Sequence, residues 1–405
     1  MTHGRQVRVL IVDDSAVMRS LLRSVLGTDK RLETVATASD GAAALRAMEA
    51  LRPDLVLLDV EMPVMDGLAT LRQMRVKGLR MPVIMCSTLT QRGAQVTIEA
   101  LAQGAADYVA KPAGQPSREA AVESLAHHLV PRILALTGAA QAAMPGGGGV
   151  FAQAGPAVGS GNGKMAGGAV SGAAALMPHG PVYSQNAHLP PVKMTGIAAQ
   201  PMVLAIGVST GGPAALDVLL PSLPGSFPLP VLVVQHMPEL FTKLLAERLD
   251  TRCALRVREA SHGDAVRPGN IYIAKGNWHM EVAGSPTNVS LRLNQDAAEN
   301  HCRPAVDVLF RTAVGVWGSG VLGVILTGMG SDGFLGCRLI RDHGGAVLAQ
   351  DQATSAVWGM PGVVTTAGLA HKVLPLPAIA PEVLKLAGRG QREAMELREA
   401  VVGRC

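Results

Sequence analysis

Short apolar runs alternate with helix-like stretches over the first 130 residues of the chain. Each run has the length of a buried strand: VRVLIV, DLVLLD, PVIMCS and DYVAK, with the weaker LETVATA as a fifth. Two of the intervening stretches begin at Ser15 and Asp40, residue types that commonly cap helices. The alternation predicts a five-stranded parallel sheet with helices on both faces, in a first domain covering 1–130.

A second α/β series begins at Pro201. Its apolar runs are MVLAIGV, LPVLVVQ, NIYIAK, GVLGVILTG and GGAVLAQ, again separated by helical stretches. The pattern predicts a doubly wound α/β domain with a mostly parallel sheet at 201–390. The remaining residues, 391–405, are rich in charged side chains and are expected to form a C-terminal tail.

The strand and helix pattern is lost between the two series, from about Thr137 to Gln200. This segment is rich in Gly, Ala and Pro, has no acidic residue and no Arg, and carries only Lys164 and Lys193. Burial in such a chain cannot offset the entropy lost on ordering, so we expect a flexible linker at 131–200. A length of 405 residues agrees with two domains.

The charge of the chain argues against a nucleic-acid partner. The formal net charge of +5 divides into +2 for residues 1–136, +2 for 137–200 and +1 for 201–405, with no block of like charge. A DNA-binding second domain would need a basic face or a helix-turn-helix in residues 201–405, and neither is indicated.

The five cysteines form no Cys-x-x-Cys pair, so their spacing supports neither a disulfide framework nor a zinc site. The N-terminus has no signal-peptide pattern, and no apolar stretch is long enough to span a bilayer. We expect a cytoplasmic protein with no direct membrane insertion.

Acidic residues follow two strands of the first domain. Asp13 and Asp14 come after the first strand and Asp59 ends the third, while Lys111 follows the fifth. In an open parallel sheet these strand ends border the ligand crevice. Three carboxylates there need a shared cation, and Mg²⁺ prefers oxygen ligands. The group suits phosphoryl transfer onto a carboxylate.

The runs VLIVDDS, LLDVEMPVMDG, MCST and DYVAKP resemble the flavodoxin-like receiver domain of two-component response regulators. The resemblance covers about 125 residues. It implies that Asp59 is phosphorylated by a histidine kinase and that Asp13, Asp14 and Asp59 hold Mg²⁺. It further implies a receiver switch made of Ser87, Tyr108 and Lys111.

The second domain contains a G-x-S-x-G turn, in which Ser209 lies between a strand and a helix. A Gly-rich turn of this kind also suits a non-catalytic phosphate cradle. His236 follows the next apolar strand and Asp332 follows a third, so all three side chains are expected at one edge of the sheet. Nucleophile, base and orienting acid are the groups that a serine hydrolase requires.

Other residues of the same types lie in polar, loop-like contexts. An unselected His is usually a structural or surface residue, and an isolated Asp is more often a cap or turn residue. The competing candidates are His262, His279, His301, His343, Asp307 and Asp351.

The motifs IGVSTGGP, VVQHMP, HGDAVRPGNIYIA, RPAVDVLF and LTGMGSDG resemble the catalytic domain of chemotaxis protein-glutamate methylesterases. The resemblance implies that Ser209 is the nucleophile, His236 the base and Asp332 the orienting acid. Thr210 would lie beside the nucleophile, and the Met329 amide would bind the oxyanion.

Two features depart from that family. Its usual Ala-Pro-Gly turn has Lys275 in place of the proline, and the linker is longer than is typical.

The two resemblances together imply a phosphorylation-activated serine hydrolase that removes glutamate methyl esters from methyl-accepting chemotaxis receptors. Deamidation of specific glutamines on the same receptors is also implied. The esterase step needs no cofactor on this view. The unphosphorylated receiver is expected to pack over the strand-end face of the esterase.

Overall fold

The computed structural model describes residues 5–88, 90–112, 115–139 and 200–388. Residues 140–199 of the expected linker and the whole of the expected tail at 391–405 lie outside these ranges. The two α/β domains are described here one at a time.

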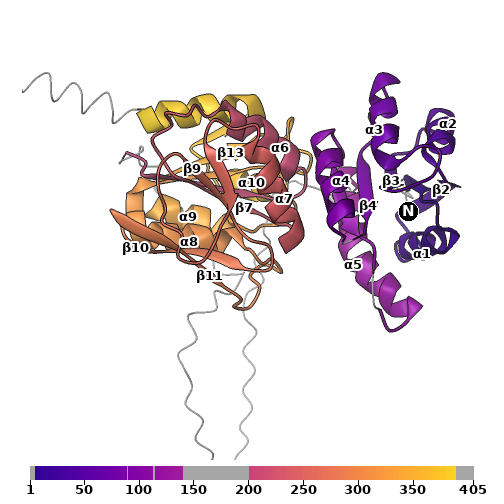
Figure 1. Ribbon diagram of the computed structural model, residues 1–405, viewed down its shortest axis with the longest axis horizontal. Coiled ribbons are helices and arrows are strands. Elements are labelled where there is room, and N and C mark those ends of the chain that lie inside the picture. The colour runs from indigo at the N-terminus through magenta and orange to yellow at the C-terminus, as the bar shows by residue number, and fades with distance from the viewer. Residues whose placement is uncertain (1–4, 89, 113–114, 140–199, 389–405) are drawn as a thin grey trace, which may run out of the picture. The chain divides into compact units, whose positions relative to one another are not determined.

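The first domain is a five-stranded parallel sheet with a helix after each strand (Figure 1). The strands are ordered β2-β1-β3-β4-β5 across the sheet. In chain order the elements are β1 (Val7–Val12), α1 (Ala16–Leu26), β2 (Leu32–Ala38), α2 (Gly41–Leu51), β3 (Leu55–Asp59), α3 (Gly67–Val76), β4 (Val83–Ser87), α4 (Gln91–Ala102), β5 (Asp107–Ala110) and α5 (Arg118–Leu136).

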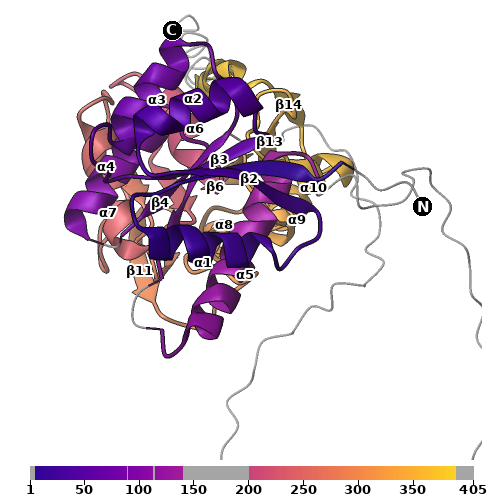
Figure 2. The same ribbon diagram turned by 90° about the vertical axis from the view of Figure 1, so that its right-hand side faces the viewer.

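Alternate side chains of each strand point to opposite faces of this sheet, and each face is covered by helices. Val9 and Ile11 pack with α1 and α5, whereas Leu10 and Val12 pack with α2 and α3. Figure 2 shows the two helix layers on either side of the strands. The predicted caps are confirmed, because the side chains of Ser15 and Asp40 accept hydrogen bonds from the first turns of α1 and α2.

The second domain is built on seven parallel strands, with a separate hairpin. In chain order its elements are β6 (Val203–Val208), α6 (Gly212–Leu219), η1 (Leu220–Ser222), β7 (Val231–Gln235), α7 (Glu239–Asp250), β8 (Arg256–Glu259), β9 (Asn270–Ile273), β10 (His279–Ser285), β11 (Asn288–Asn294), α8 (Val306–Trp317), η2 (Gly318–Gly320), β12 (Val321–Ile325), α9 (Phe334–Asp342), β13 (Ala346–Gln350), α10 (Met360–Thr366) and β14 (Lys372–Leu374). Residues 376–388 are helical as well.

The order of these strands creates a topological switch at β6. The sheet runs β14-β13-β12-β6-β7-β9-β8, so the chain moves outward from β6 through β7 on one side and through β12 on the other. A crevice outside the carboxyl ends of strands is expected at such a switch. The first domain has the same feature between β1 and β3.

Both faces of the second sheet are covered by layers of apolar side chains. Leu204 and Ile206 face the layer with α6 and α7, while Val203 and Ala205 face α8 and the β10–β11 hairpin. Fully burying one leucine or isoleucine side chain stabilises the folded domain by about 1.5–3 kcal/mol relative to leaving it exposed. The predicted α/β class, with a mostly parallel second sheet, is confirmed. No helix within the described ranges has the length and hydrophobicity needed to cross a membrane.

Candidate functional site

Ser209 lies in a tight turn directly after the central strand β6. Its amide donates to the carbonyl of Thr327, 3.0 Å away, and its own carbonyl accepts from the Gln235 side chain at 3.1 Å. Gly211 is the N-cap residue of α6 and lies in the left-handed region with φ 78°, a conformation that favours glycine. The turn therefore holds Ser209 at the amino end of a helix, at the carboxyl edge of the sheet.

His236 and Asp332 meet at the same edge. His236 is the first residue after β7, and its amide donates to the Val208 carbonyl that precedes Ser209, at 3.2 Å. Its Nε2 lies 2.8 Å from Oδ2 of Asp332, which comes from the loop between β12 and α9. The Ser209 hydroxyl makes no hydrogen bond to any described residue. Catalytic hydrogen bonds often form only when substrate binds, so a Ser209 hydroxyl without a bond to the described residues agrees with a serine site that holds no substrate.

The Asp332 carboxylate is held by several donors at once. Oδ2 accepts from the Val306 amide at 2.6 Å, and Oδ1 accepts from the amides of Asp307 and Gly333 at 3.1 and 2.9 Å. The Asn300 side chain donates to Oδ1 at 3.0 Å. Val306 and Asp307 open α8, and Gly333 immediately precedes α9. The carboxylate therefore lies at the positive ends of two helix dipoles.

These contacts keep Asp332 ionised and His236 basic. Burial raises the pKa of Asp332, but the hydrogen bond from His236 and the backbone donors outweigh it, and the pKa lies below its usual value. For His236, burial lowers the pKa, whereas the Asp332 carboxylate and the nearby Cys302 raise it further than burial lowers it. Because Asp332 contacts Nε2, the other ring nitrogen, Nδ1, is left free to accept a proton.

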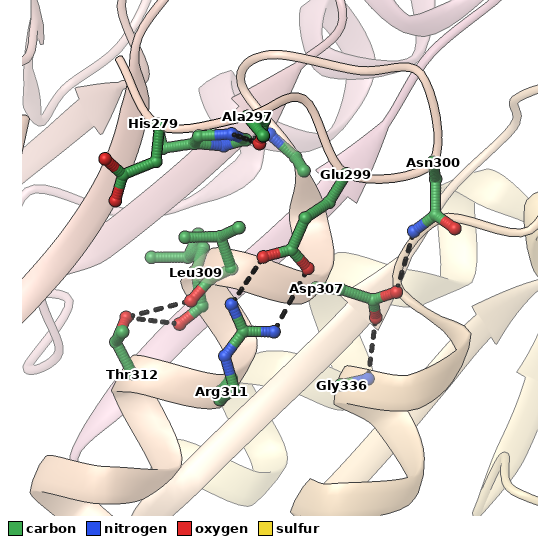
Figure 3. A network of polar contacts seen from close by, with 12 residues as sticks. His279, Ala297, Glu299, Asn300, Asp307, Leu309, Arg311, Thr312 and Gly336 are labelled. Atoms are coloured by element: carbon green, nitrogen blue, oxygen red, sulfur yellow. Dashed lines mark hydrogen bonds and ion pairs between the residues drawn. The ribbon is translucent and has the colours of Figure 1, made fainter. Parts of the chain in front are cut away.

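A second buried carboxylate, Asp307, shares a donor with Asp332, and Figure 3 shows its bonds to Asn300 and Gly336. Asn300 donates from one amide nitrogen to Asp332 and, at 2.9 Å, to Oδ2 of Asp307. Oδ1 of Asp307 accepts from the Gly336 amide at 2.7 Å. Burial and the charge on Asp332 raise the pKa of Asp307 to about 7. Figure 3 also shows Arg311 bonded through both terminal nitrogens to Glu299, next to this loop.

Sequence reasoning missed Asn300, and it treated Asp307 as a cap or turn residue. Asp307 instead lies in the first turn of α8, and the residue in the N-cap position is Ala305. The RPAVDVLF motif, which contains Asp307, was the signal available for it. For Asn300, no pattern in the loop would have identified it.

Backbone amides near Ser209 are available to bind an anion. Within the described ranges, the amides of Thr210 and Met329 donate to no other residue. The loop carrying Met329 passes close to the serine, since a Cβ placed on Gly328 would lie 2.8 Å from the Ser209 Cβ. An amide next to the nucleophile and a second from a neighbouring loop form the usual oxyanion hole. Thr210 and Met329 are thus both present at this edge.

The competing candidates occupy structural positions. The ring of His279 lies between the Ala297 carbonyl and the Ala305 amide. His343 contacts the Leu339 carbonyl, and His262 contacts the backbone of Leu293. His301 is exposed. None of these four bonds a described carboxylate.

Asp351 is a turn residue, as expected, because its Oδ1 accepts from the amide and hydroxyl of Thr354. Lys275, the departure in the Ala-Pro-Gly turn, pairs with Glu239 at 2.6 Å. Its charge is therefore partly neutralised at the start of α7.

The acidic residues of the first domain also come together. The carboxylate oxygens of Asp13, Asp14 and Asp59 lie within 4.8 Å of one another. Lys111 Nζ lies 2.8 Å from both Asp13 Oδ2 and Asp59 Oδ1. Burial raises the pKa of Asp59 to about 6; the Asp13 charge adds to this, and Lys111 opposes it. Three carboxylates with a single lysine, in a half-buried crevice, fit a divalent cation with oxygen ligands.

The other residues of the predicted switch lie on the neighbouring strands β4 and β5. Ser87 ends β4, and its hydroxyl donates to the Thr88 carbonyl at 3.1 Å. Tyr108 lies on β5, and its carbonyl accepts from the Arg132 guanidinium. The Lys111 amide donates to the Ser87 carbonyl at 2.7 Å, which ties the end of β5 to the end of β4.

Two family models match this chain: the response regulator receiver domain over residues 9–123 and CheB methylesterase over 204–383. A protein-glutamate methylesterase/protein-glutamine glutaminase of Nocardioides sp. is 46% identical, over 95% of this chain and 96% of the relative. One of the same name from Trichodesmium erythraeum is 41% identical, over 94% and 99%.

Among solved structures, the CheB methylesterase catalytic domain of Thermotoga maritima is 42% identical, with a TM-score of 0.45, over 46% of this chain and 100% of that one. The likeness to the curated relatives extends over nearly the full length of both chains and includes both domains. The chain belongs to the receiver-linked protein-glutamate methylesterase/protein-glutamine glutaminase family.

Proposed function

We propose that the second domain hydrolyses γ-methyl esters of glutamate on chemotaxis receptors, with Ser209 as nucleophile, His236 as base and Asp332 as the orienting acid. The observation that carries the proposal is the convergence of three strand ends on one edge, with His236 Nε2 bonded to Asp332 at 2.8 Å. The names of the full-length relatives supply the substrate class.

The reaction follows from this arrangement. His236 takes the Ser209 proton at Nδ1, and the serine oxygen attacks the γ-carbonyl carbon. The Thr210 and Met329 amides stabilise the negative oxygen of the tetrahedral intermediate. Methanol leaves with the proton from His236, and water then hydrolyses the acyl-enzyme to give glutamate. The same steps on a glutamine side chain release ammonia, which gives deamidation.

The first domain regulates this activity through phosphorylation. A receiver domain is phosphorylated in a Mg²⁺-dependent reaction, and we assign Asp59 as the acceptor of a phosphoryl group from a histidine kinase. Asp13, Asp14 and Asp59 would hold the ion, which supplies positive charge to the transferring phosphoryl group. Lys111 is within reach of the same group from Asp59. We propose that the phosphoryl group shifts the population away from a conformation in which the receiver covers the esterase edge.

Methanol release from membranes carrying methylated chemoreceptors tests both assignments. Wild type, Ser209→Ala and Asp59→Ala are compared with and without a small phosphodonor and Mg²⁺. Ser222→Ala, at an exposed serine that donates to the Val218 carbonyl, is the matched control. We expect Ser209→Ala to fall at least about 1,000-fold, Ser222→Ala to match wild type, and the phosphodonor to stimulate only proteins that retain Asp59.

The nucleophile can also be examined without receptors. A serine-reactive phosphonate should label wild type and Ser222→Ala but not Ser209→Ala, whereas a phosphate cradle would not be labelled at all. Methanol release by Ser209→Ala at the wild-type rate would exclude the proposed nucleophile.

A further inference from the structure

A thiol lies beside the base of the candidate esterase site. Cys302 Sγ is 3.6 Å from His236 Nδ1, the nitrogen that does not contact Asp332. The two residues are 66 positions apart, and Cys302 comes from the loop between β11 and α8. Spacing along the chain therefore gave no sign of a Cys–His pair, and only the fold brings the two side chains together.

The loop holds Cys302 in a defined position. Its amide and carbonyl both bond to Glu299, at 2.8 and 3.1 Å, which closes a tight turn. The next residue, Arg303, donates to the Asn277 side chain at 2.8 Å and to the carbonyls of Gln295 and Asp296 at 2.9 Å. Bonds of the Cys302 backbone and of the Arg303 side chain thus fix the loop that carries the sulfur.

The spacing of the two atoms matches a tetrahedral zinc site. Zn–S and Zn–N bonds of about 2.3 and 2.05 Å at a tetrahedral angle place the two ligand atoms about 3.6 Å apart. The Sγ–Nδ1 distance here is also 3.6 Å. One cation can therefore contact both atoms without a rearrangement of either residue.

The other side of the imidazole is arranged as it is in zinc sites. A histidine that binds zinc typically donates its second ring N–H to a carboxylate, which fixes the tautomer and orients the ring. Asp332 accepts from Nε2 in this way and is itself held by backbone amides. The lone pair on Nδ1 then points away from Asp332, on the side where Cys302 lies.

We propose that Cys302 and His236 bind a soft divalent cation, with Zn²⁺ as the expected ion, and that the bound ion reversibly inhibits the esterase. The thiol loses its proton to solvent, a Zn–S and a Zn–N bond form, and water completes the tetrahedron. Because the Nδ1 lone pair is then occupied, His236 cannot accept the Ser209 proton. This inhibition rests on the proposed role of His236, whereas the binding of the ion does not.

We expect the site to bind Zn²⁺ with moderate affinity, because the protein supplies only two ligands. Structural zinc sites use four protein ligands, and this site offers two. We expect inhibition at micromolar free Zn²⁺, complete reversal by a chelator, and no effect of Mg²⁺ at this site, because Mg²⁺ prefers oxygen ligands.

The binding test uses Co²⁺ as a spectroscopic probe on the full chain. A cysteine thiolate bound to Co²⁺ gives a sulfur-to-metal charge-transfer band, and tetrahedral Co²⁺ gives intense visible bands. Wild type should show both, and Cys302→Ser and His236→Ala should lose them. Cys253→Ser, at the other half-buried cysteine of the described ranges, is the matched control and should keep them. Charge-transfer absorption of wild-type intensity in Cys302→Ser would overturn the site.

The inhibition test uses methanol release, expressed as a fraction of each variant's own metal-free rate. The Zn²⁺ concentration for half-inhibition should rise at least about tenfold in Cys302→Ser and stay unchanged in Cys253→Ser. Equal sensitivity of wild type and Cys302→Ser would refute the proposal. Ser209→Ala separates the two questions, because it should keep the Co²⁺ bands: activity in that variant refutes the esterase assignment, and missing bands in wild type refute the metal site.

Discussion

Single side chains decide how the acid at the esterase edge is held. Asn300 uses one amide group to contact two buried carboxylates, Asp307 and Asp332. Without this shared donor the two like charges would face each other with less compensation. Asn300 is therefore a positioning residue for Asp332. The charge of Asp332 adds to the effect of burial in raising the pKa of Asp307.

Replacing Asn300 with Ala should lower kcat by about 10–100-fold with little change in KM, because the orientation of Asp332 matters mainly in the transition state. Methanol release at varied receptor concentration measures this split. Asn288→Ala, at an exposed asparagine in the β10–β11 hairpin, is the control and should match wild type. A change in KM alone would contradict the positioning role.

Asp307 should make the esterase domain less stable as the pH rises. Its pKa of about 7 in the folded state exceeds the ordinary value of 3.8, so the folded domain keeps a proton that the unfolded chain has released. Stability is then present at acid pH and is lost between about pH 4 and 7, at up to about 1.4 kcal/mol for each pH unit.

The comparison of wild type with Asp307→Asn measures this effect. All three tryptophans lie in the second domain, so denaturant unfolding followed by their fluorescence reports on that domain. Relative to wild type, Asp307→Asn should gain stability between pH 5 and pH 8. A pH-independent difference for Asp307→Asn would exclude the raised pKa.

At this scale the sequence predicted the residues that follow strands. The residues predicted for each site follow or end apolar runs, and each parallel sheet brings its own set together. These are Ser209, His236 and Asp332 in the second domain and Asp13, Asp59 and Lys111 in the first. The segment between β11 and α8 has no periodic pattern of apolar residues. It contains Asn300 and Cys302, and Asp307 lies just after it. Their positions depend on how that loop folds back, which no local pattern encodes.

The helices of the two domains begin in different ways. All five helices of the first domain have a side-chain cap: Ser15, Asp40, Asp66, Thr90 and Ser117. None of the helices α6 to α10 has one. At the carboxyl edge of the sheet, Asp332 accepts from the first two amides of α8, and the Thr210 amide in the Ser209 turn bonds to no described residue. The catalytic edge thus gains donors that a capped helix would have consumed.

The loop after β12 leaves no room for a side chain at Gly328. A Cβ there would lie 2.8 Å from the Ser209 Cβ and 3.1 Å from its amide nitrogen, and it would press on Met360 as well. Gly328→Ala should therefore displace Ser209 and reduce methanol release at least about tenfold.

Gly315→Ala is the matched control, because a Cβ at this exposed position in α8 has nothing within 4 Å. It should keep full activity and gain up to about 1 kcal/mol of stability from the better helix former. Wild-type activity in Gly328→Ala would show that the loop can move away from the serine.

The elements that sequence reasoning missed are short or polar. The hairpin strands β10 and β11 alternate between buried and exposed residues, unlike the continuous apolar runs that identified the parallel strands. Strands β8 and β14 lie at the two edges of the sheet and have only four and three residues. Such edge strands are defined by their neighbours more than by their own composition.

At the scale of the whole molecule, the chain carries two chemistries on two separate parallel sheets. Each site lies at a topological switch, between β1 and β3 in one sheet and around β6 in the other. The residues assigned to phosphoryl transfer and those assigned to ester hydrolysis share no strand. Each reaction should therefore survive the loss of the other site's reactive group.

Ser209→Ala should accept a phosphoryl group from a small phosphodonor as wild type does. Phosphate-affinity electrophoresis in the presence of Mg²⁺ measures the phosphorylated fraction. Removal of Mg²⁺ by a chelator and the substitution Asp59→Ala should each abolish it, because both the ion and the acceptor are required. Phosphorylation of Asp59→Ala to the wild-type extent would place the acceptor elsewhere.

The bond from Nε2 of His236 to Asp332 has a consequence for magnetic resonance spectra. The ring proton that the carboxylate shields from solvent is attached to Nε2, so a strongly downfield, slowly exchanging proton signal should correlate with the ε nitrogen of this imidazole. In serine hydrolases whose acid contacts the δ nitrogen, the corresponding signal belongs to that atom. Selective nitrogen labelling of histidine would thus reveal which way the ring faces in solution.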